Sequence, residues 1–402
     1  MRAFGFLAIF LSAVVAVGAQ PAAADTWEET VTKARGQTVF WNAWAGDERI
    51  NAYIAWAGAQ VKNRYGVAVK HVKLSDTAEA VSRVVAEKAA GRTSGGSVDL
   101  IWINGENFAA MKRNKLLFGP WTSNAPNYRF VDTIGKKTTT IDFTIPVDGL
   151  EAPWGMAQFV FMYDSKSLPT PPTSIKGLLN WAKQNEGRFT YPQPPNFLGT
   201  TFLKQALIEL VADPTVLQKE VDPKQFAAVT APLWRFLDAL HPAMWRSGKV
   251  FPQNGPAQHR LLDDGEVDIA LSFQPAEASS LIAQGSLPDT VRTFVLAGGT
   301  VGNTSFVAIP FNAKARDGAM VLADFLMSPE AQARKQNPEF WGSGTVLAID
   351  KLPVTEQNRF GNLKLGIATL PPERLGDTLL EPHTSWVTAL EEDWAKRYAA
   401  GK

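Results

Sequence analysis

The stretch that decides the fold is Val98-Asp99-Leu100-Ile101-Trp102-Ile103, which Asn104 and Gly105 follow. Because this run is apolar apart from one aspartate, it predicts a strand that is covered on both faces, which is typical of a parallel sheet. Asn-Gly favours a turn, and the residues from Glu106 to Lys115 carry a helical pattern. The stretch therefore predicts a buried strand that turns directly into a helix.

Two further strand and helix pairs precede this stretch. Residues 38–44 are β-prone, and residues 48–65 place apolar side chains at helical spacing. A second strand is expected at 67–72, followed by a helix that Asp76 and Glu79 cap at its start and Gly91 ends. The order βαβαβα predicts an open α/β sheet with right-handed crossovers.

The rest of the chain continues to mix strands and helices, without an internal repeat or a low-complexity tract. The expected strands are 153–163, 267–273, 293–296 and 305–310, and the expected helices are 174–184, 200–211 and 318–327. At 402 residues, the chain is long enough for two domains with large cores.

The composition excludes several classes of protein. There is no cysteine, so a disulfide scaffold, a thiolate metal site, a cysteine nucleophile and a lipoprotein anchor are all excluded. Forty basic residues balance 39 acidic ones, which gives no overall field for nucleic acid or an anionic membrane. Four histidines leave little material for a metal centre, and we expect no metal and no cofactor. The thirteen tryptophans need an explanation.

The first 24 residues have the pattern of a signal peptide. Arg2 precedes an apolar run from Phe4 to Val17, and the segment ends in Ala22-Ala23-Ala24. This A-x-A pattern predicts cleavage before Asp25 and export of the mature chain. The run is too short for a transmembrane span, and we expect a periplasmic protein without a lipid anchor.

Six phrases, in this order and spacing, resemble extracellular solute-binding proteins of ABC importers, and most closely the large maltose-, spermidine- and thiamine-type group. They lie at 39–54, 96–103, 152–168, 168–181, 264–270 and 306–332. Asn42-Ala43-Trp44-Ala45-Gly46 and Asn104-Gly105-Glu106-Asn107-Phe108 further resemble an enterobacterial-type branch of that family. The chain departs from the family in carrying Asp164 where many members have asparagine, and in the acidic pair Asp47-Glu48.

The resemblance implies an α/β protein with the two-lobed periplasmic-binding-protein fold of type II, in which open mixed sheets are flanked by helices and hinge strands join the lobes. The expected parts are residues 1–24 as signal peptide, 25–152 and 305–345 as lobe one, 153–304 as lobe two, and 346–402 as a C-terminal helical segment of open lobe assignment. Such a protein closes its lobes on a small ligand and delivers it to the permease subunits in the membrane. We expect a monomer.

Ligands of open α/β sheets bind beyond the carboxyl ends of the strands, so the residues at predicted strand ends, crossovers and helix starts are the candidates. The candidate ligand-binding residues are Asn42, Trp44, Gly46, Asn104, Glu106, Asn107, Trp154, Gln158, Thr200, Thr201, Phe273, Gln274, Asn303 and Thr304. They combine flat apolar faces with amide and hydroxyl groups, the mixture that a small-molecule site requires.

Each candidate also has a structural interpretation. Trp41 and Trp102 lie inside strands and are assigned to the core, whereas Trp44 and Trp154 lie at strand ends beside glycine. Asn104-Gly105 suits a plain turn, Thr200 and Thr201 suit a helix cap, and Glu106 suits a helix start. The alternatives stay open at this point.

The charges near the candidates predict the sign of the ligand. Asp47, Glu48 and Glu106 occupy two helix starts and would repel an anion, and Arg49 is the only guanidinium nearby. Tryptophan faces and a carboxylate suit a cation that is thiamine-like, choline-like or a polyamine. A neutral sugar stacked on the same tryptophans is the alternative. Ferric iron is disfavoured because the tyrosines are scattered.

Two alternatives from other classes remain. A secreted hydrolase would need paired carboxylates, such as Glu106 and Asp268, but Asp268 lies in a predicted buried strand. The run Glu391-Glu392-Asp393 is interpreted as a solvated helix face. Since the sequence has no Gly-x-Ser-x-Gly elbow, HExxH, Walker loop or GxGxxG motif, we expect a binding protein rather than an enzyme. An adhesin or scaffold finds no support in the neutral, two-lobed pattern.

Overall fold

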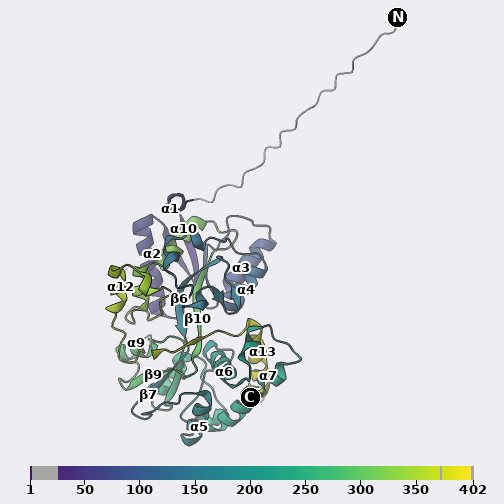
Figure 1. Ribbon diagram of the computed structural model, residues 1–402, viewed down its shortest axis with the longest axis vertical. Coiled ribbons are helices and arrows are strands. Elements are labelled where there is room, and N and C mark those ends of the chain that lie inside the picture. The colour runs from purple at the N-terminus through teal and green to yellow at the C-terminus, as the bar shows by residue number, and fades with distance from the viewer. Residues whose placement is uncertain (2–25, 372–373, 400–402) are drawn as a thin grey trace.

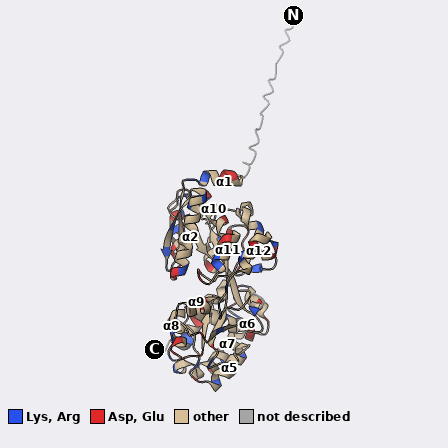
Figure 2. Cartoon of the chain, turned by 90° about the vertical axis from the view of Figure 1, so that its left-hand side faces the viewer, with Lys and Arg blue, Asp and Glu red and all other residues tan. Residues whose placement is uncertain are grey.

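The computed structural model describes residue 1, residues 26–371 and residues 374–399. It consists of two lobes, one above the other in Figure 1, and Figure 2 shows the narrow waist that joins them. The predicted signal peptide, residues 1–24, lies outside the described residues apart from Met1. In the described part of the chain, none of the helices combines the length and apolar character that crossing a bilayer requires.

Lobe one is built on a six-stranded mixed sheet with the order β11-β10-β3-β1-β2, in which β6 also pairs with β10. The central strand β1 (Thr38–Trp44) runs parallel to β2 (Ala68–Leu74) and β3 (Leu100–Ile103). The long strand β10 (Thr300–Ala308) runs antiparallel to β3 and to β6 (Glu151–Gln158). The predicted βαβαβα unit and the α/β class are confirmed.

Helices cover both faces of this sheet, as the apolar strand β3 predicts. One core lies under α1 (Trp27–Ala34), α2 (Glu48–Tyr65) and α10 (Arg316–Leu326), and the other under α3 (Ala78–Ala89) and α4 (Gly105–Arg113). The one polar residue of the predicted strand, Asp99, is buried and accepts hydrogen bonds from the backbone N–H groups of Phe40 and Ala315. Its charge therefore stabilises backbone groups that the sheet leaves unpaired.

Lobe two has a smaller sheet of three strands in which β7 (Val160–Asp164) lies between β8 (Ile269–Ser272) and β9 (Val291–Phe294). Both neighbours run antiparallel to β7. The surrounding helices are α5 (Ile175–Gln184), α6 (Phe197–Leu210), α7 (Phe226–Leu240), α8 (Gly255–Asp263), α9 (Glu277–Ala283) and α13 (Thr384–Trp394). The single strand predicted at 153–163 is wrong: it is β6 and β7, which belong to different sheets and are separated by the buried Phe159.

Two long antiparallel strands, β6 and β10, connect the lobes. Trp154 of β6 packs in the core of lobe one, whereas Ala157 packs in that of lobe two. Likewise Val307 of β10 lies in lobe one and Val301 in lobe two. The pairing of the two strands shifts register between Ser305 and Phe306, at the level of the waist. These strands are the hinge strands that the fold of the family implies.

The C-terminal segment, whose lobe the sequence leaves open, packs on both lobes. After α11 (Pro329–Gln336), α12 (Val354–Gly361) packs on lobe one through Phe360, and α13 packs on lobe two through Trp386 and Leu390. Between them β11 (Thr378–Leu379) pairs with the lobe-two end of β10. Short elements complete the description: β4 (Ile141–Asp142), β5 (Ile145–Pro146), the 3₁₀ turns 122–124, 126–130, 137–139, 214–218, 241–243, 245–248 and 349–351, and a π turn at 395–399.

Candidate ligand-binding site between the lobes

The turn after β3 brings Glu106 to the junction of the lobes. Gly105 begins α4 with a φ of 58°, and a Cβ atom there would lie 2.9 Å from the ring of Phe143, so glycine is required on both grounds. The Gly105 N–H donates a hydrogen bond to the buried carboxyl of Asp142, at 2.7 Å. The turn interpretation of Asn104-Gly105 is therefore right, and the same turn presents the solvent-exposed Glu106.

Lys204 of α6 approaches the same place from lobe two. Its Nζ atom lies 2.6 Å from an oxygen of Glu381, and the two side chains are 2% and 1% exposed. The same ammonium lies 5.5 Å from the ring centre of Phe143 in lobe one and 5.4 Å from that of Phe197 in lobe two. One buried cation thus contacts both lobes and the C-terminal segment.

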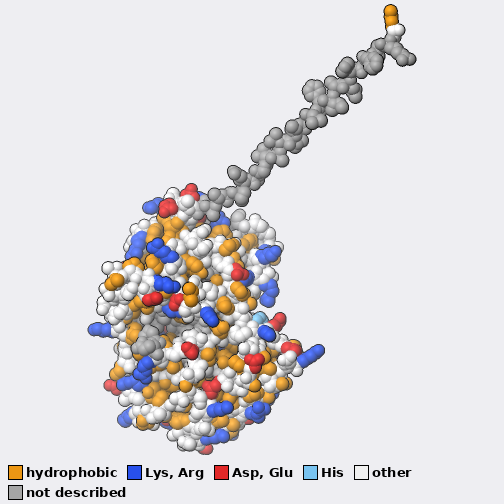
Figure 3. Space-filling model, viewed as in Figure 1, with side chains coloured by type: hydrophobic (Ala, Val, Ile, Leu, Met, Phe, Trp, Pro, Cys, Tyr) orange, Lys and Arg blue, Asp and Glu red, His pale blue; other side chains and the backbone are white. Residues whose placement is uncertain are grey.

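Hydrogen bonds connect further predicted residues to this pair. The second carboxylate oxygen of Glu381 accepts from the Asn303 amide at 3.1 Å. On α6, Thr200 donates from its hydroxyl to Glu391 of α13 at 2.7 Å. We call the group formed by Glu106, Phe143, Phe197, Thr200, Lys204, Asn303, Glu381 and Glu391 the interlobe cluster. In the space-filling view the surface is indented where the two lobes meet (Figure 3).

The electrostatics of the interlobe cluster are dominated by carboxylates. Burial raises the pKa of Glu106; the charge of Lys204 opposes this shift and that of Glu381 adds to it. Burial also raises the pKa of Glu391, and the charge of Glu106 contributes in the same direction. Glu106 is exposed to solvent, and neighbouring atoms still displace part of the water around its carboxylate. Three carboxylates face one ammonium, so negative charge remains uncompensated.

Aromatic side chains flank the interlobe cluster on both lobes. Trp44 is 39% exposed, and its ring lies over Gly46, where a Cβ atom would come within 2.1 Å of it. Because β1 and β3 are parallel neighbours, Trp44 ends its strand at the same sheet edge as the Glu106 turn. On lobe two, Phe197 is 47% exposed and meets the ring of Phe273 edge-on, with 4.8 Å between the ring centres.

Other predicted residues have their polar groups committed to the fold. The Asn42 amide is fully buried, donates to the Phe40 carbonyl and accepts from Arg83. Three more predicted residues donate hydrogen bonds within their own helix or the hinge region. The Thr201 hydroxyl donates to the Phe197 carbonyl, and the Thr304 hydroxyl donates to that of Thr138. The Gln158 amide donates to the Thr300 hydroxyl and the Leu375 carbonyl. The side chains of these four residues are buried and have hydrogen-bond partners within the fold, which favours the structural interpretation; their place in a ligand site stays a prediction.

Trp154 also departs from the expectation of a ligand platform. It is completely buried, and the ammonium of Lys335 lies 3.5 Å from its ring centre and 4.2 Å from that of Trp341. A Cβ atom on Gly155 would lie 2.1 Å from the same ammonium. Trp154 does stack against a cation, but the cation is a lysine of this chain. Much of the tryptophan excess serves this core, where Trp41 and Trp102 also pack.

Two further amide candidates are Gln274 and Asn107. The side-chain oxygen of Gln274 is buried without a hydrogen-bond partner among the described residues. Asn107 contacts the Glu106 carboxylate at 3.4 Å. Asp268, by contrast, pairs with Arg188 and accepts a hydrogen bond from the Ser167 hydroxyl, contacts that fit the structural interpretation.

Sequence reasoning missed Phe143, Lys204 and Glu381, and it assigned Glu391 to a solvated face. Lys204 does carry a signal, because a single lysine within the otherwise apolar run Phe202-Leu203-Lys204-Gln205-Ala206-Leu207 predicts a buried and paired charge. Phe143 and Glu381 lie in irregular segments, so no periodicity indicates which way they face. Glu391 approaches Thr200 only because α13 packs on α6, a long-range contact that the local pattern does not contain.

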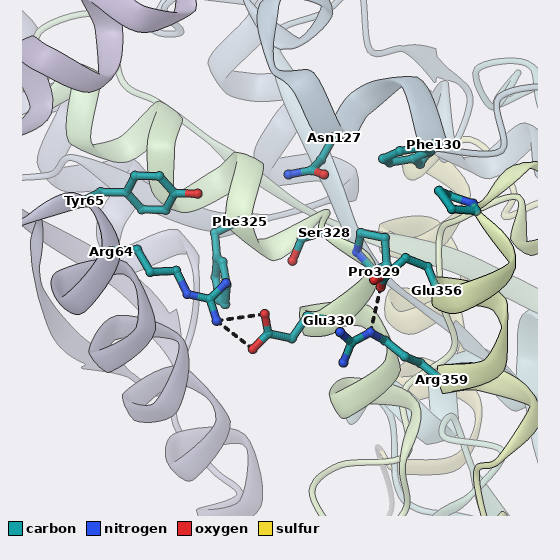
Figure 4. A pocket seen from close by; sticks show the side chains of 11 residues that line it. Arg64, Tyr65, Asn127, Phe130, Phe325, Ser328, Pro329, Glu330, Glu356 and Arg359 are labelled. Atoms are coloured by element: carbon teal, nitrogen blue, oxygen red, sulfur yellow. Dashed lines mark hydrogen bonds and ion pairs between the residues drawn. The ribbon is translucent and has the colours of Figure 1, made fainter.

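Two cavities lie away from this site. One, of about 270 Å³ on lobe one, is flanked by the ion pairs Arg64–Glu330 and Arg359–Glu356 (Figure 4). Another, of about 570 Å³, lies between α9 and the loop after α11. Neither contains a predicted ligand residue, and the guanidinium groups of the first are already paired with carboxylates.

Comparisons with known proteins agree with the lobes and the hinge. Residues 56–347 match the family model described as bacterial extracellular solute-binding protein. The chain belongs to this family of bacterial extracellular solute-binding proteins. Protein YnjB of Escherichia coli (strain K12) is 45% identical to this solute-binding protein over 375 residues, which cover 93% of this chain and 94% of that one.

Solved structures show that the two-lobed fold is shared. A putative extracellular solute-binding protein from Bordetella parapertussis has a TM-score of 0.64 at 15% identity, and the spermidine/putrescine substrate-binding protein PotD from Streptococcus pneumoniae has 0.61 at 15%. AfuA from Actinobacillus pleuropneumoniae, bound to fructose-6-phosphate, has 0.60 at 13%. In each case 90% of this chain and 99% of the other are covered.

Proposed function

We propose that this solute-binding protein captures a small organic cation between its lobes and delivers it to its permease. The observation that carries the proposal is the charge of the interlobe cluster, in which Glu106, Glu381 and Glu391 face the single ammonium of Lys204. An ammonium or quaternary nitrogen is the ligand group that relieves the repulsion among the remaining carboxylates. A phosphate or carboxylate would increase it.

The aromatic residues support the same ligand class. Trp44 and Phe197 are exposed on different lobes. Phe197 already contacts the Lys204 ammonium, and Trp44 ends its strand at the sheet edge where the Glu106 turn begins. Cation–π attraction contributes about 1–2 kcal/mol when the ligand is desolvated. Lobe closure would bring the two ring faces and the carboxylates around the ligand together, which couples binding to the hinge at β6 and β10.

A thermal-shift series tests the proposal. Choline, putrescine and thiamine represent cations, maltose represents neutral sugars, and fructose 6-phosphate represents anions. We expect saturable stabilisation by at least one of the cations and none by maltose or fructose 6-phosphate. Glu106→Gln should weaken the cation's affinity about tenfold, because a charge-assisted hydrogen bond is lost.

The matched control is Glu28→Gln, which removes the same charge from an exposed position on α1. This variant should bind as the wild type does. Stabilisation by the sugar with no response to any of the cations would refute the proposal and favour the neutral-ligand alternative.

A further inference from the structure

The ammonium of Lys204 occupies the kind of environment that an amine ligand would need. It is buried, bonded to a carboxylate oxygen of Glu381, and placed beside one aromatic ring from each lobe. Glu381 in turn is oriented by the Asn303 amide of the hinge strand β10. Carboxylate, aromatic rings and an orienting amide together form a complete ammonium subsite, and its occupant is a side chain.

The fold of α6 alone does not require a lysine here. The neighbouring residues Phe202, Leu203, Ala206 and Leu207 are fully buried and apolar, as expected for a helix packed on all sides. Burying an ammonium among them is costly unless it is paired. The pairing with Glu381 offsets that cost, but an apolar residue at position 204 and a neutral residue at position 381 would satisfy the packing equally well.

Phe143 supplies the contact from lobe one, and its backbone is strained. Its φ is 54°, a left-handed conformation that a non-glycine residue adopts at a cost, and its ring is held against Gly105, next to Glu106. Phe143 thus contacts the Lys204 ammonium and also lies against Gly105, so the buried Lys204 subsite adjoins the turn that carries Glu106.

We propose that Lys204 is a tethered occupant of this ammonium subsite and thereby determines which cations the protein accepts. This inference rests on the proposed function. With Lys204 neutralising one of the three carboxylates, Glu106 and Glu391 are left for the ligand. The ligand class is then an organic cation with one or two positive charges. A triamine should bind less well, because Lys204 already occupies the subsite that its third amine would need.

Lys204→Ala tests the proposal because alanine removes the ammonium and most of the alkyl chain, which leaves room in the subsite for a free amine. In this variant n-butylammonium, which matches the lost side chain, should raise the melting temperature saturably, whereas the same concentration of sodium should not. The wild type should respond less, because its own lysine fills the subsite beside Glu381. The affinity for spermidine relative to putrescine should rise about tenfold in the variant, the effect of one added charge-assisted hydrogen bond.

A double variant, Lys204→Ala with Glu381→Gln, removes both charges and leaves no unpaired buried carboxylate. It should fold and should respond to n-butylammonium no more than the wild type does. If Lys204→Ala alone fails to fold, refolding in n-butylammonium should recover it. Equal n-butylammonium responses of the wild type and Lys204→Ala, or equal responses of the double variant and Lys204→Ala, would overturn the proposal, as would failed recovery of the single variant.

The two proposals fail in different ways. If the wild type binds none of the organic cations, the proposed function is wrong, while the n-butylammonium response of Lys204→Ala still decides whether the subsite exists. If the wild type binds putrescine and Lys204→Ala gains no preference for spermidine, the proposed function stands and the role of Lys204 is wrong.

Discussion

The Nζ atom of Lys335 lies 3.5 Å from the ring centre of Trp154 and donates a hydrogen bond to the carbonyl oxygen of the same residue. Lys335 is completely buried, and no carboxylate of the described residues pairs with it in a salt bridge. Because Trp154 belongs to the hinge strand β6, this contact fixes α11 to the hinge. Aromatic rings take the place of a counter-ion.

We predict that the stability contribution of Lys335 depends on pH. Burial holds its pKa well below the ordinary value of 10.5, so below that pH the unfolded chain binds the proton more tightly than the folded one. The wild type should therefore lose stability as pH falls from 10 to 7, relative to Lys335→Met. The stability of the variant relative to the wild type should therefore be greater at pH 7 than at pH 9.5.

Thermal unfolding of both proteins at pH 7 and pH 9.5 measures this difference. Lys62→Met, at an exposed position of α2, is the matched control and should show no pH-dependent gain. If Lys335→Met were less stable than the wild type by the same amount at pH 7 and at pH 9.5, the predicted pH dependence would be contradicted.

Gly155→Ala should destabilise the protein by about 2 kcal/mol or more. The added methyl group would lie 2.1 Å from the Lys335 ammonium, which the surrounding rings prevent from moving aside. Gly298→Ala is the control, because nothing lies within 4 Å of its Cβ position, and it should change stability by less than about 0.5 kcal/mol. Chemical denaturation measures both, and equal effects would contradict the packing described here.

The sequence predicts the lobe-one framework closely because local signals and tertiary packing agree there. Residues 38–44 and 48–65 form β1 and α2 with the predicted bounds, since Asp47 caps the helix and Gly66 ends it in a left-handed conformation. The prediction of one strand over 153–163 fails because apolar pattern does not reveal that a strand changes sheets at Phe159.

The site is predicted only in part, and for a physical reason. The strand-end rule finds Glu106 and Trp44, because the position of a strand end follows from local sequence. The burial of Trp154, however, depends on its contact with Lys335, which lies 181 residues away in the sequence and is not indicated by any local pattern. Glu381 and Glu391 enter the interlobe cluster through the path of the C-terminal segment, which local patterns do not specify.

Acidification should weaken cation binding, and the weakening should begin at a higher pH than the one at which ordinary carboxylates take up protons. Burial raises the pKa of both Glu106 and Glu391, so each carboxylate takes up a proton at a higher pH than the ordinary value of 4.5. Protonation removes the attracting charge, and the dissociation constant of a bound cation should rise between pH 7 and pH 5. Titrations at the two pH values measure this. In Glu106→Gln the dependence should be shallower, and an affinity that increases on acidification would contradict the assignment.

Trp44 should report ligand binding by its fluorescence, because it is the tryptophan exposed beside the Glu106 turn. Trp44→Phe should abolish most of the ligand-induced change. Trp234→Phe is the control, since Trp234 is buried in lobe two and bonded to Thr230 of its own helix. Titration of each variant with the same cation measures the change; its full retention in Trp44→Phe would place the ligand elsewhere.

Isothermal titration calorimetry of the wild type with choline, putrescine and thiamine, beside maltose and fructose 6-phosphate, tests the central claim most directly. The excess of carboxylates between the lobes predicts one-to-one binding of at least one of the three cations, weakened by Glu106→Gln, with no heat of binding from the sugar or the sugar phosphate. Saturable one-to-one binding of maltose or fructose 6-phosphate, with none of any cation, would contradict it.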